Sequence, residues 1–364
     1  MRLTRVRLRD FRSYSAAEAS LGAGVTVVHG RNGAGKTNLL EAVYLGCTGH
    51  SWRTASDVQL IRWGAEAARV ELGALGDDGP HAFSVGLAPG ERRRLRVDGA
   101  RVERLADVPS RPLAAVFLPD RLELVKGGPS LRRAHMDQLV AALWPARDAT
   151  RRAYAQALAQ RNALLGRAGG AAASLDTWDA ELARHGIALM DDRRRAVDAL
   201  TRGFPELAAT LGLEGEVTLA YRPRSAARTV AELSGELLAR RDRDRDRGFT
   251  AHGPHRDELA IARGGRDLRP FGSQGEQRIA VLALLLAERA AIAAMRGTPP
   301  VMLLDDAMSE LDASRRERLM AMLRNSGQSL ITTTDVAHVP GGDEAGVARL
   351  AVSEGVVLTA AEAA

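Results

Sequence analysis

The chain has 364 residues, of which 45% are hydrophobic and 26% are charged. This globular composition excludes collagen-like, low-complexity fibrous and wholly disordered chains, and at roughly 100–200 residues per domain the length predicts two or three domains. The longest uninterrupted apolar run, 279–287, is much shorter than the roughly 20 residues of a membrane span, so we expect no transmembrane helix and no membrane partner.

Cysteine usage and the N-terminal segment indicate a reducing compartment. The chain has one cysteine, Cys47, which cannot form an internal disulfide. Residues 1–14 alternate apolar residues with arginine and lack the continuous apolar stretch of a secretory signal. We therefore expect a cytoplasmic protein.

The charge balance is basic and depends almost entirely on arginine. The chain has 51 Lys and Arg against 45 Asp and Glu, and its lysines are Lys36 and Lys126. This excess is compatible with a nucleic-acid partner, although codon bias also enriches arginine. Aromatic residues make up 4% of the chain, which argues against base stacking on a single-strand platform as the main binding mode.

Patterns in the N-terminal part predict strands around one helix. Alternating apolar and polar residues predict a strand over 3–8, and an apolar run predicts a second strand over 24–29. Helical composition follows at 38–48. Over 70–97, short alternating segments separated by Gly and Pro predict hairpins.

The middle of the chain is helical in character. Helical periodicity covers 131–165 and 174–203, with a break at Gly169–Gly170, and predicts two antiparallel helices. A strand is expected over 216–221. Arg and Asp alternate over 240–247 without apolar residues, which we interpret as an exposed, poorly ordered loop or a frayed helix end.

The C-terminal part returns to mixed strands and helices. A long apolar helix is expected after 272–277, and strands are expected over 301–304 and 329–334. The simplest layout is an α/β domain interrupted by a helical insertion. We place the two halves of the α/β domain at 1–129 and 250–364, and the helical insertion at 130–249.

A phosphate-binding loop is predicted between the strand at 24–29 and the helix at 38–48. It reads Gly30, Arg31, Asn32, Gly33, Ala34, Gly35, Lys36 and Thr37, which is the Walker A pattern in its required context. Its glycines let backbone N–H groups turn toward phosphates, and the helix N-terminus adds positive potential. We expect ATP, with Lys36 at the β- and γ-phosphates and Thr37 on Mg²⁺; a glycine-rich turn without a ligand is the alternative.

Asp305 and Asp306 follow the strand expected over 301–304. This apolar strand should be buried on both faces and lie beside the strand that leads into the phosphate loop. We expect Asp305 to hold Mg²⁺ as a Walker B aspartate does, and Asp306 to be the catalytic group that orients the attacking water. The alternative is a strand-end turn with two capping carboxylates.

Two further segments resemble motifs of ABC-type ATPases. Ser273, Gln274, Gly275 and Glu276, ahead of a helix, resemble the signature motif, and Ser309 to Asp312 resembles the D-loop. Each alone is also readable as a helix cap or a loop, but their order around Walker B is specific. The resemblance implies that the signature of one head binds the nucleotide of another in trans, and hence an ATP-dependent homodimer.

Additional segments distinguish among ABC-type ATPases. The helical part at 130–203 is too short for the coiled-coil arm of SMC and Rad50-like proteins, and a transporter head would sit beside membrane domains. Along essentially its full length the sequence resembles the RecF recombination-mediator family. The segments that match, besides the motifs above, are 8–14, 116–120, 124–129, Arg132–Arg133, 160–162 and 253–257.

The resemblance implies an ABC-type, SMC- and Rad50-like P-loop ATPase head, an α/β fold, with an inserted helical domain. It further implies a weak, DNA-stimulated ATPase that binds gapped DNA at single-strand/double-strand junctions and cooperates with RecO and RecR to load RecA. DNA replication, recombinational repair and the SOS response are the processes that the family serves. A Rad50- or SMC-like ATPase subunit with an architectural role is the alternative.

Two departures from related proteins bear on hydrolysis. Asp120–Arg121 stands where the family carries an acidic pair, which argues against a Mg²⁺ or water contact by Arg121. Residues 331–335 contain no counterpart of the switch histidine of transporters, so slow hydrolysis is expected. A purely architectural DNA-binding protein that used ATP only to hold a dimer together would need no acid for hydrolysis. The presence of Asp306 therefore favours an ATP-hydrolysing protein over an architectural one.

Other charged residues have two interpretations each. Arg12 is a nucleotide contact or a solvated strand-end arginine. Arg92–Arg94, with Arg96 and Arg101, forms a basic cluster that touches DNA phosphates or protects a sheet edge. Residues 255–257 form a polar cluster near the dimer seam or a structural turn. The eight histidines show no metal-ligand spacing, so no structural zinc is expected.

Overall fold

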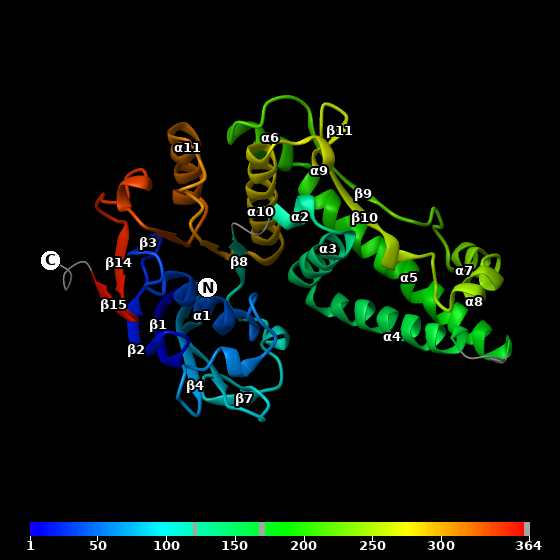
Figure 1. Ribbon diagram of the computed structural model, residues 1–364, viewed down its shortest axis with the longest axis horizontal. Coiled ribbons are helices and arrows are strands. Elements are labelled where there is room, and N and C mark those ends of the chain that lie inside the picture. Colours follow the sequence, from blue (N-terminus) through cyan, green and yellow to red (C-terminus); the bar gives the residue numbers. More distant parts are fainter. Residues whose placement is uncertain (119–121, 167–171, 360–364) are drawn as a thin grey trace. The chain divides into compact units, whose positions relative to one another are not determined.

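The computed structural model describes residues 1–118, 122–166 and 172–359, and the chain forms two compact units (Figure 1). The first unit combines Met1–Arg121 with Ile292–Ala364, and the second is Leu122–Ala291. Packing therefore groups all of 250–291 with the insertion, although we expected this segment in the α/β domain. The functional division at 129 and 249 stays a prediction.

A largely parallel sheet forms one half of the first unit. Its order is β15-β14-β3-β13-β12-β8, and among these described strands only β15 runs antiparallel to its neighbour. All residues of β12 and β13 are buried, as expected for central strands covered on both faces. The strands are β3 (Val25–His29), β8 (Ala114–Phe117), β12 (Val301–Leu304), β13 (Ser329–Thr333), β14 (Ala348–Ser353) and β15 (Val356–Thr359).

An antiparallel sheet in the order β2-β1-β4-β5-β6-β7 forms the other half. Alternating burial along β1 and β4 gives it an apolar face. The hairpins expected over 70–97 are confirmed, as β4 pairs with β5 and β5 with β6. The strands are β1 (Arg2–Phe11), β2 (Tyr14–Ser20), β4 (Ala68–Gly76), β5 (Gly79–Leu87), β6 (Arg94–Val97) and β7 (Ala100–Val102).

Helix α1 (Lys36–Thr48) lies between the two sheets. It packs against β4 and β5 of the antiparallel sheet and against β8 and β13 of the parallel sheet. Leu39, Leu40 and Val43 are fully buried, because a helix enclosed on both sides is apolar around much of its circumference. Cys47 is buried as well, which raises the pKa of its thiol to about 12. This core holds the N-terminus of α1 in place.

The second unit is mostly helical. Its small antiparallel sheet has the order β11-β10-β9, from β9 (Val217–Arg222), β10 (Glu258–Arg263) and β11 (Arg266–Asp267). Its helices are α2 (Glu123–Lys126), α3 (Pro129–Leu143), α4 (Asp148–Leu165), α5 (Ala172–Thr201), α6 (Phe204–Thr210), α7 (Val230–Leu238), α8 (Arg241–Arg247), α9 (Leu268–Phe271) and most of α10 (Gln274–Arg296).

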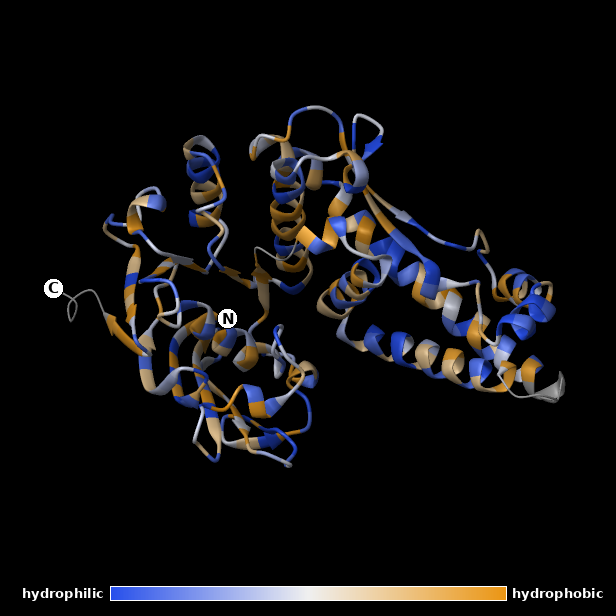
Figure 2. Cartoon of the chain, in the orientation of Figure 1, coloured by the Kyte–Doolittle hydropathy of each residue, from blue (hydrophilic) through white to orange (hydrophobic). Residues whose placement is uncertain are grey.

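One helix prediction needs refinement, and one is confirmed. The stretch expected as one helix over 131–165 is two helices, α3 and α4, because Pro145 lacks the N–H that a continuous helix needs. The apolar run 279–287 lies in α10, which carries hydrophobic colour in Figure 2, and every residue of the run is buried. Among the described residues, no helix combines the length and the apolar character needed to cross a membrane. Helix α11 (Ala313–Arg324) completes the first unit.

The expectation of a poorly ordered loop or frayed end at 240–247 is wrong. The segment is helix α8, and Asp244 in it is 1% exposed. Arg161, fully buried on α4, donates from Nη1 to Asp244 Oδ2 at 2.7 Å and from Nε to Asp179 Oδ1 at 2.5 Å. The alternating charges therefore include a buried carboxylate, whose cationic partner lies far away in the chain.

Replacing Asp244 by Ala should destabilise the second unit by about 3 kcal/mol. This is the lower end of the cost of breaking a buried ion pair, because Asp179 still accompanies Arg161. Urea unfolding followed by circular dichroism measures the change. The control is Asp242→Ala on the same helix, whose side chain is 97% exposed, and it should change stability by less than about 0.5 kcal/mol. Equal losses in both variants would contradict a structural role for the buried pair.

Candidate nucleotide site

The loop between β3 and α1 has space for glycine alone at two points. Gly30 has a φ of 155° and Gly35 a φ of 116°, which side chains rarely adopt. A Cβ on Gly30 would lie 2.1 Å from the carbonyl oxygen of Val352, and one on Gly35 would lie 2.9 Å from Ser13 Oγ. The loop therefore runs close against β14 and the turn between β1 and β2.

Tyr14, at the start of β2, supports the end of the loop. Its hydroxyl donates to the carbonyl of Gly35 at 2.9 Å, and burial raises its pKa, so the hydroxyl stays protonated and keeps donating. Beside it, Asn38 Nδ2 donates to Ser13 Oγ at 3.0 Å. The Walker A pattern does not predict these contacts, and the 8–14 segment drew attention only through its family resemblance.

Lys36 is the first residue of α1, and its side chain folds back over the loop. Nζ donates to the carbonyl oxygens of Gly30 at 2.8 Å and Arg31 at 3.0 Å. Burial lowers the pKa of Lys36, whereas the carboxylates of Asp306 and Asp305 raise it. The ammonium thus lies in the loop, in the field of both acids and beside the positive end of α1.

Thr37 and Asp305 lie together although 268 positions separate them in the chain. Thr37 Oγ1 is 3.0 and 2.9 Å from the two carboxylate oxygens of Asp305. The expectation that β12 adjoins β3 is wrong, because β13 lies between them. Thr332 lies on this intervening strand, β13, and its Oγ1 donates to Asp305 Oδ1 at 2.7 Å. Sequence reasoning missed Thr332, since one threonine in the run Thr332–Thr334 carries no motif of its own.

Asp306 has a different environment from its neighbour. Its φ of 47° is unusual for a residue other than glycine, and its N–H donates to Thr332 Oγ1 at 2.8 Å. Its Oδ1 is buried and has no hydrogen-bond partner in the described part of the chain. Strained backbone and buried unpaired polar atoms are both uncommon and concentrate at functional sites. Asp305 is therefore a bonded carboxylate and Asp306 one with a free acceptor.

The segment Ser273–Glu276 begins helix α10, in the second unit. The N–H of Ser273 donates to Glu276 Oε2 at 2.7 Å, and the N–H of Glu276 donates to Ser273 Oγ at 3.3 Å, which is a capping box. Ser273 and Gln274 are exposed. The helix-cap interpretation therefore holds locally, and it leaves a serine and a helix N-terminus at the surface. A contact with nucleotide stays a prediction.

Ser309 and Asp312 hold the turn that leads from β12 to α11. Ser309 Oγ donates to the carbonyl of Asp306 at 2.9 Å. Asp312 is the N-cap of α11 and accepts from the N–H of Arg315 at 2.9 Å. Movement of this turn would therefore reach Asp306 directly, as a D-loop role requires, and that role stays a prediction.

Arg12 is bound to α1 and is not a solvated strand-end residue. Its guanidinium donates to the two carboxylate oxygens of Glu41 at 2.9 and 2.7 Å, and to the carbonyl of Gln59 at 2.8 Å. Glu41 is fully buried. A carboxylate within an apolar helix is a sequence signal for such a partner. Contact between Arg12 and a nucleotide stays a prediction.

The basic cluster at 92–101 is partly neutralised. Arg93 pairs with Asp57 at 2.6 Å, and Arg94 pairs with Glu91 at 2.5 Å. Arg93 also donates to the carbonyl of Gly49. These contacts favour the edge-protecting interpretation for Arg93 and Arg94. The departure at Asp120–Arg121 lies outside the described residues.

A polar cluster does form around residues 255–257, within the second unit. Tyr154 Oη lies 2.7 Å from His255 Nδ1. Asp257, fully buried, accepts from Arg193 Nη1 at 3.1 Å. Burial raises the pKa of Asp257, and the bonds from Tyr221 and Arg193 oppose this. The proximity of this cluster to a dimer seam stays a prediction.

The fold and the site together define an ABC-type P-loop ATPase head with an inserted, mostly helical unit. The defining features are the sheet order, the phosphate loop before α1 and Asp305 at the end of β12. A family model described as an AAA domain matches residues 5–92. The fold is also similar to that of an Smc head bound to the C-winged helix domain of ScpA, with a TM-score of 0.61, 19% identity and full coverage of both chains.

The chain belongs to the RecF family of DNA replication and repair proteins. It is 40% identical over 348 residues to RecF of Anaeromyxobacter sp. strain Fw109-5, covering 92% of this chain and 93% of that protein. It is 37% identical to RecF of Myxococcus xanthus strain DK1622, covering 100% and 98%. A structure of the recombination mediator protein RecF with ATP, in the RecFOR pathway, has a TM-score of 0.88 and 26% identity and covers 98% of this chain and 97% of that one. The family indicated by the sequence is confirmed.

Proposed function

We propose that this protein is an ATP-dependent recombination mediator of the bacterial cytoplasm. It is a weak, DNA-stimulated ATPase that dimerises on ATP, binds gapped DNA at single-strand/double-strand junctions, and helps RecO and RecR to load RecA. The observation that carries the proposal is the cradle that Lys36, Thr37 and Asp305 form from distant parts of the chain. The similar RecF structure with ATP, described for the RecFOR pathway, supports the same ligand and partners.

The start of α1 suits a nucleotide triphosphate with Mg²⁺. Lys36 Nζ is a compact donor that can turn from the loop carbonyls to phosphate oxygens, and the first N–H groups of α1 add further donors. Thr37 Oγ1 and the Asp305 carboxylate, 2.9 Å apart, are the hard oxygen ligands that Mg²⁺ prefers. Bound Mg²⁺ supplies charge neutralisation at the phosphates. Thr332 orients Asp305 for this task through the hydrogen bond at 2.7 Å.

Asp306 is the group that we assign to hydrolysis. Its buried Oδ1, which no described residue contacts by a hydrogen bond, can accept from a water and orient that water toward the terminal phosphate. Residues 331–335, at the end of β13, contain no histidine, and Thr333 Oγ1 there donates to the carbonyl of Asp335 at 2.8 Å. One carboxylate without a histidine partner fits slow turnover, as in a switch.

An architectural dimer that uses ATP only as glue is the second candidate, because the fold is shared with Smc heads. Such a dimer needs the Lys36 cradle but no unpaired acid beside it. Keeping a buried carboxylate oxygen without a donor lowers stability, so its presence at Asp306 favours hydrolysis. The Asp306→Asn variant separates the two candidates.

Asp306→Asn should keep ATP binding and slow phosphate release by roughly 100-fold or more, because the amide has the shape of the acid without its charge. The ATP-bound dimer should then persist on gapped DNA, as measured by sedimentation velocity with labelled DNA. Asp343→Asn, an exposed carboxylate of the same unit, is the control and should turn over like wild type.

Two outcomes contradict the proposal in different ways. If Asp306→Asn releases phosphate at the wild-type rate, Asp306 has no role in hydrolysis, and the architectural dimer is the better interpretation. Wild-type binding to gapped DNA that is equally tight with and without ATP would contradict an ATP-dependent mediator.

A further inference from the structure

A groove in the second unit lies between α5, β9 and the loop that follows β9. Its volume is about 630 Å³. Three of the residues that line it are arginines, Arg194, Arg224 and Arg228, and Asp198 is the one carboxylate among these lining residues. β9 packs against α5 at this place, and its connection runs on to α7 (Figure 1). The groove is therefore basic along its lining.

Arg224 and Arg228 have uncompensated charges. Both side chains are exposed, and in the described part of the chain their guanidinium groups make no hydrogen bond or ion pair. Arg151 and Arg152, two other neighbouring arginines of this unit, both pair with Asp148 instead. Two neighbouring cations without partners raise the positive potential at the groove.

The backbone that carries these arginines is held firmly in place. The N–H of Arg224 donates to the buried Asp257 at 2.8 Å, and the N–H of Arg228 donates to Glu232 Oε2 at 2.6 Å. Between them, Ser225 Oγ donates to Glu236 Oε2 at 2.6 Å. Because the loop is already ordered, binding a ligand needs to order only the two side chains, which lowers the entropy loss on association.

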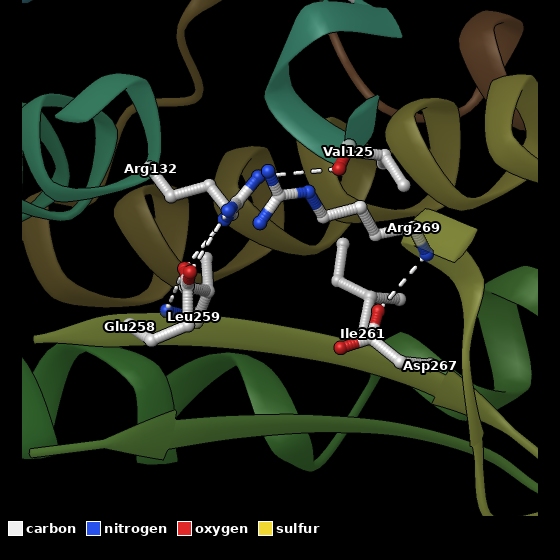
Figure 3. Close-up of a pocket in the computed structure, with 7 residues that line it drawn as sticks. All are labelled: Val125, Arg132, Glu258, Leu259, Ile261, Asp267 and Arg269. Carbon is white, nitrogen blue, oxygen red and sulfur yellow. Dashed lines mark hydrogen bonds and ion pairs between the residues drawn. The ribbon is translucent and has the colours of Figure 1, made fainter. Parts of the chain in front are cut away.

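A small cavity of about 30 Å³ in the same unit is lined by an arginine, Arg132, that is paired with a carboxylate (Figure 3). There Arg132 is 3% exposed and donates to both carboxylate oxygens of Glu258, at 2.5 and 2.8 Å, and to the carbonyl of Val125 at 3.1 Å. The chain itself satisfies this guanidinium, so Arg132 has a structural role. In the larger groove, by contrast, the guanidinium groups of two neighbouring arginines, Arg224 and Arg228, point to no acidic partner in the described part of the chain.

We propose that the groove is a DNA-binding site in which Arg224 and Arg228 donate to phosphate oxygens of the backbone. The planar guanidinium matches the geometry of a phosphate and donates two parallel hydrogen bonds to it. A groove with charge but few aromatic side chains suits the sequence-independent backbone of a duplex better than unstacked bases. This inference rests on the proposed function and adds to it the DNA-contacting surface of the second unit.

The test compares Arg224→Gln/Arg228→Gln with Arg151→Gln/Arg152→Gln, which removes the same charge from paired arginines. Binding of the full-length proteins to labelled gapped duplex DNA is measured by fluorescence anisotropy with ATP over a KCl series. The groove variant should bind roughly tenfold or more weakly at about 0.1 M salt, and its log–log salt slope should fall by about two, since each phosphate contact contributes about 0.9. The control should behave like wild type.

The remaining outcomes are distinguishable. If wild type does not bind DNA at any salt concentration, the proposed function fails, and this inference fails with it. If wild type binds and the groove variant equals the control in affinity and slope, the groove is not a DNA site, although the proposed function stands. A groove variant that loses binding to polyglutamate while keeping its DNA affinity would overturn the inference in favour of an acidic protein partner. Equal ATP binding by all proteins shows that the variants are folded.

Discussion

A Lys36→Met variant should bind ATP more weakly by roughly two orders of magnitude or more, the expected loss when one partner of a desolvated charge pair is removed. Lys36 Nζ already lies within hydrogen-bond distance of two loop carbonyls, at 2.8 and 3.0 Å, so it is positioned where the proposed nucleotide would place its phosphates. Methionine has nearly the same length but no donor and no charge. Equilibrium titration with a fluorescent ATP analogue measures the change.

The chain offers a matched control for this substitution. Lys126, at the end of α2, is its other lysine and belongs to the second unit. Lys126→Met makes the identical chemical change away from the phosphate loop, and it should leave nucleotide affinity within about twofold of wild type. Unchanged ATP affinity in Lys36→Met would show that the Walker A assignment is wrong. Equal losses in both variants would point to a general effect of charge.

Ser273→Arg should leave ATP binding by the monomer intact and prevent both dimerisation and hydrolysis. Each head keeps its own Lys36, Thr37 and Asp305 cradle, so binding in cis survives. In the proposed dimer, Ser273 and the N-terminus of α10 meet the γ-phosphate held by a second copy. Arginine is much larger and would fill the space that the phosphate needs. Sedimentation velocity with a non-hydrolysable ATP analogue should detect monomers only.

Loss of a helix cap alone must be separated from this steric effect. Thr229 is the N-cap of α7 and forms a capping box of the same kind, in the same unit. Thr229→Arg therefore loses a comparable cap, worth about 1 kcal/mol, without touching the proposed interface. This control should dimerise like wild type. A Ser273→Arg protein that also dimerises normally would show that the segment does not act in trans.

A mixture of Ser273→Arg and Lys36→Met proteins extends this test. The mixed dimer has one composite site with an intact cradle and an intact Ser273, and a second site in which both are altered. We therefore expect the mixture to recover part of the dimerisation and at most half of the wild-type phosphate release. No recovery at any mixing ratio would contradict composite sites.

The sequence by itself determined the local elements and the family. Strand β12 is a run of apolar residues, and α10 has an apolar run longer than one face needs, so both follow from side-chain periodicity alone. The phosphate loop likewise depends on glycines whose positive φ values are local properties. The order of these motifs along the chain indicated the RecF family, and the relatives confirm it.

Only the tertiary structure decided which distant groups meet. It placed β13 between β3 and β12, and so brought Thr332 to Asp305. It turned the charged segment at 240–247 into a helix, because the buried Arg161 needs the carboxylate of Asp244. It also brought two unpaired arginines to one groove. Periodicity and local motifs indicate the backbone conformation of a segment and which of its faces is buried. The partner of a buried charge depends on which distant segments pack together, and no local pattern encodes that.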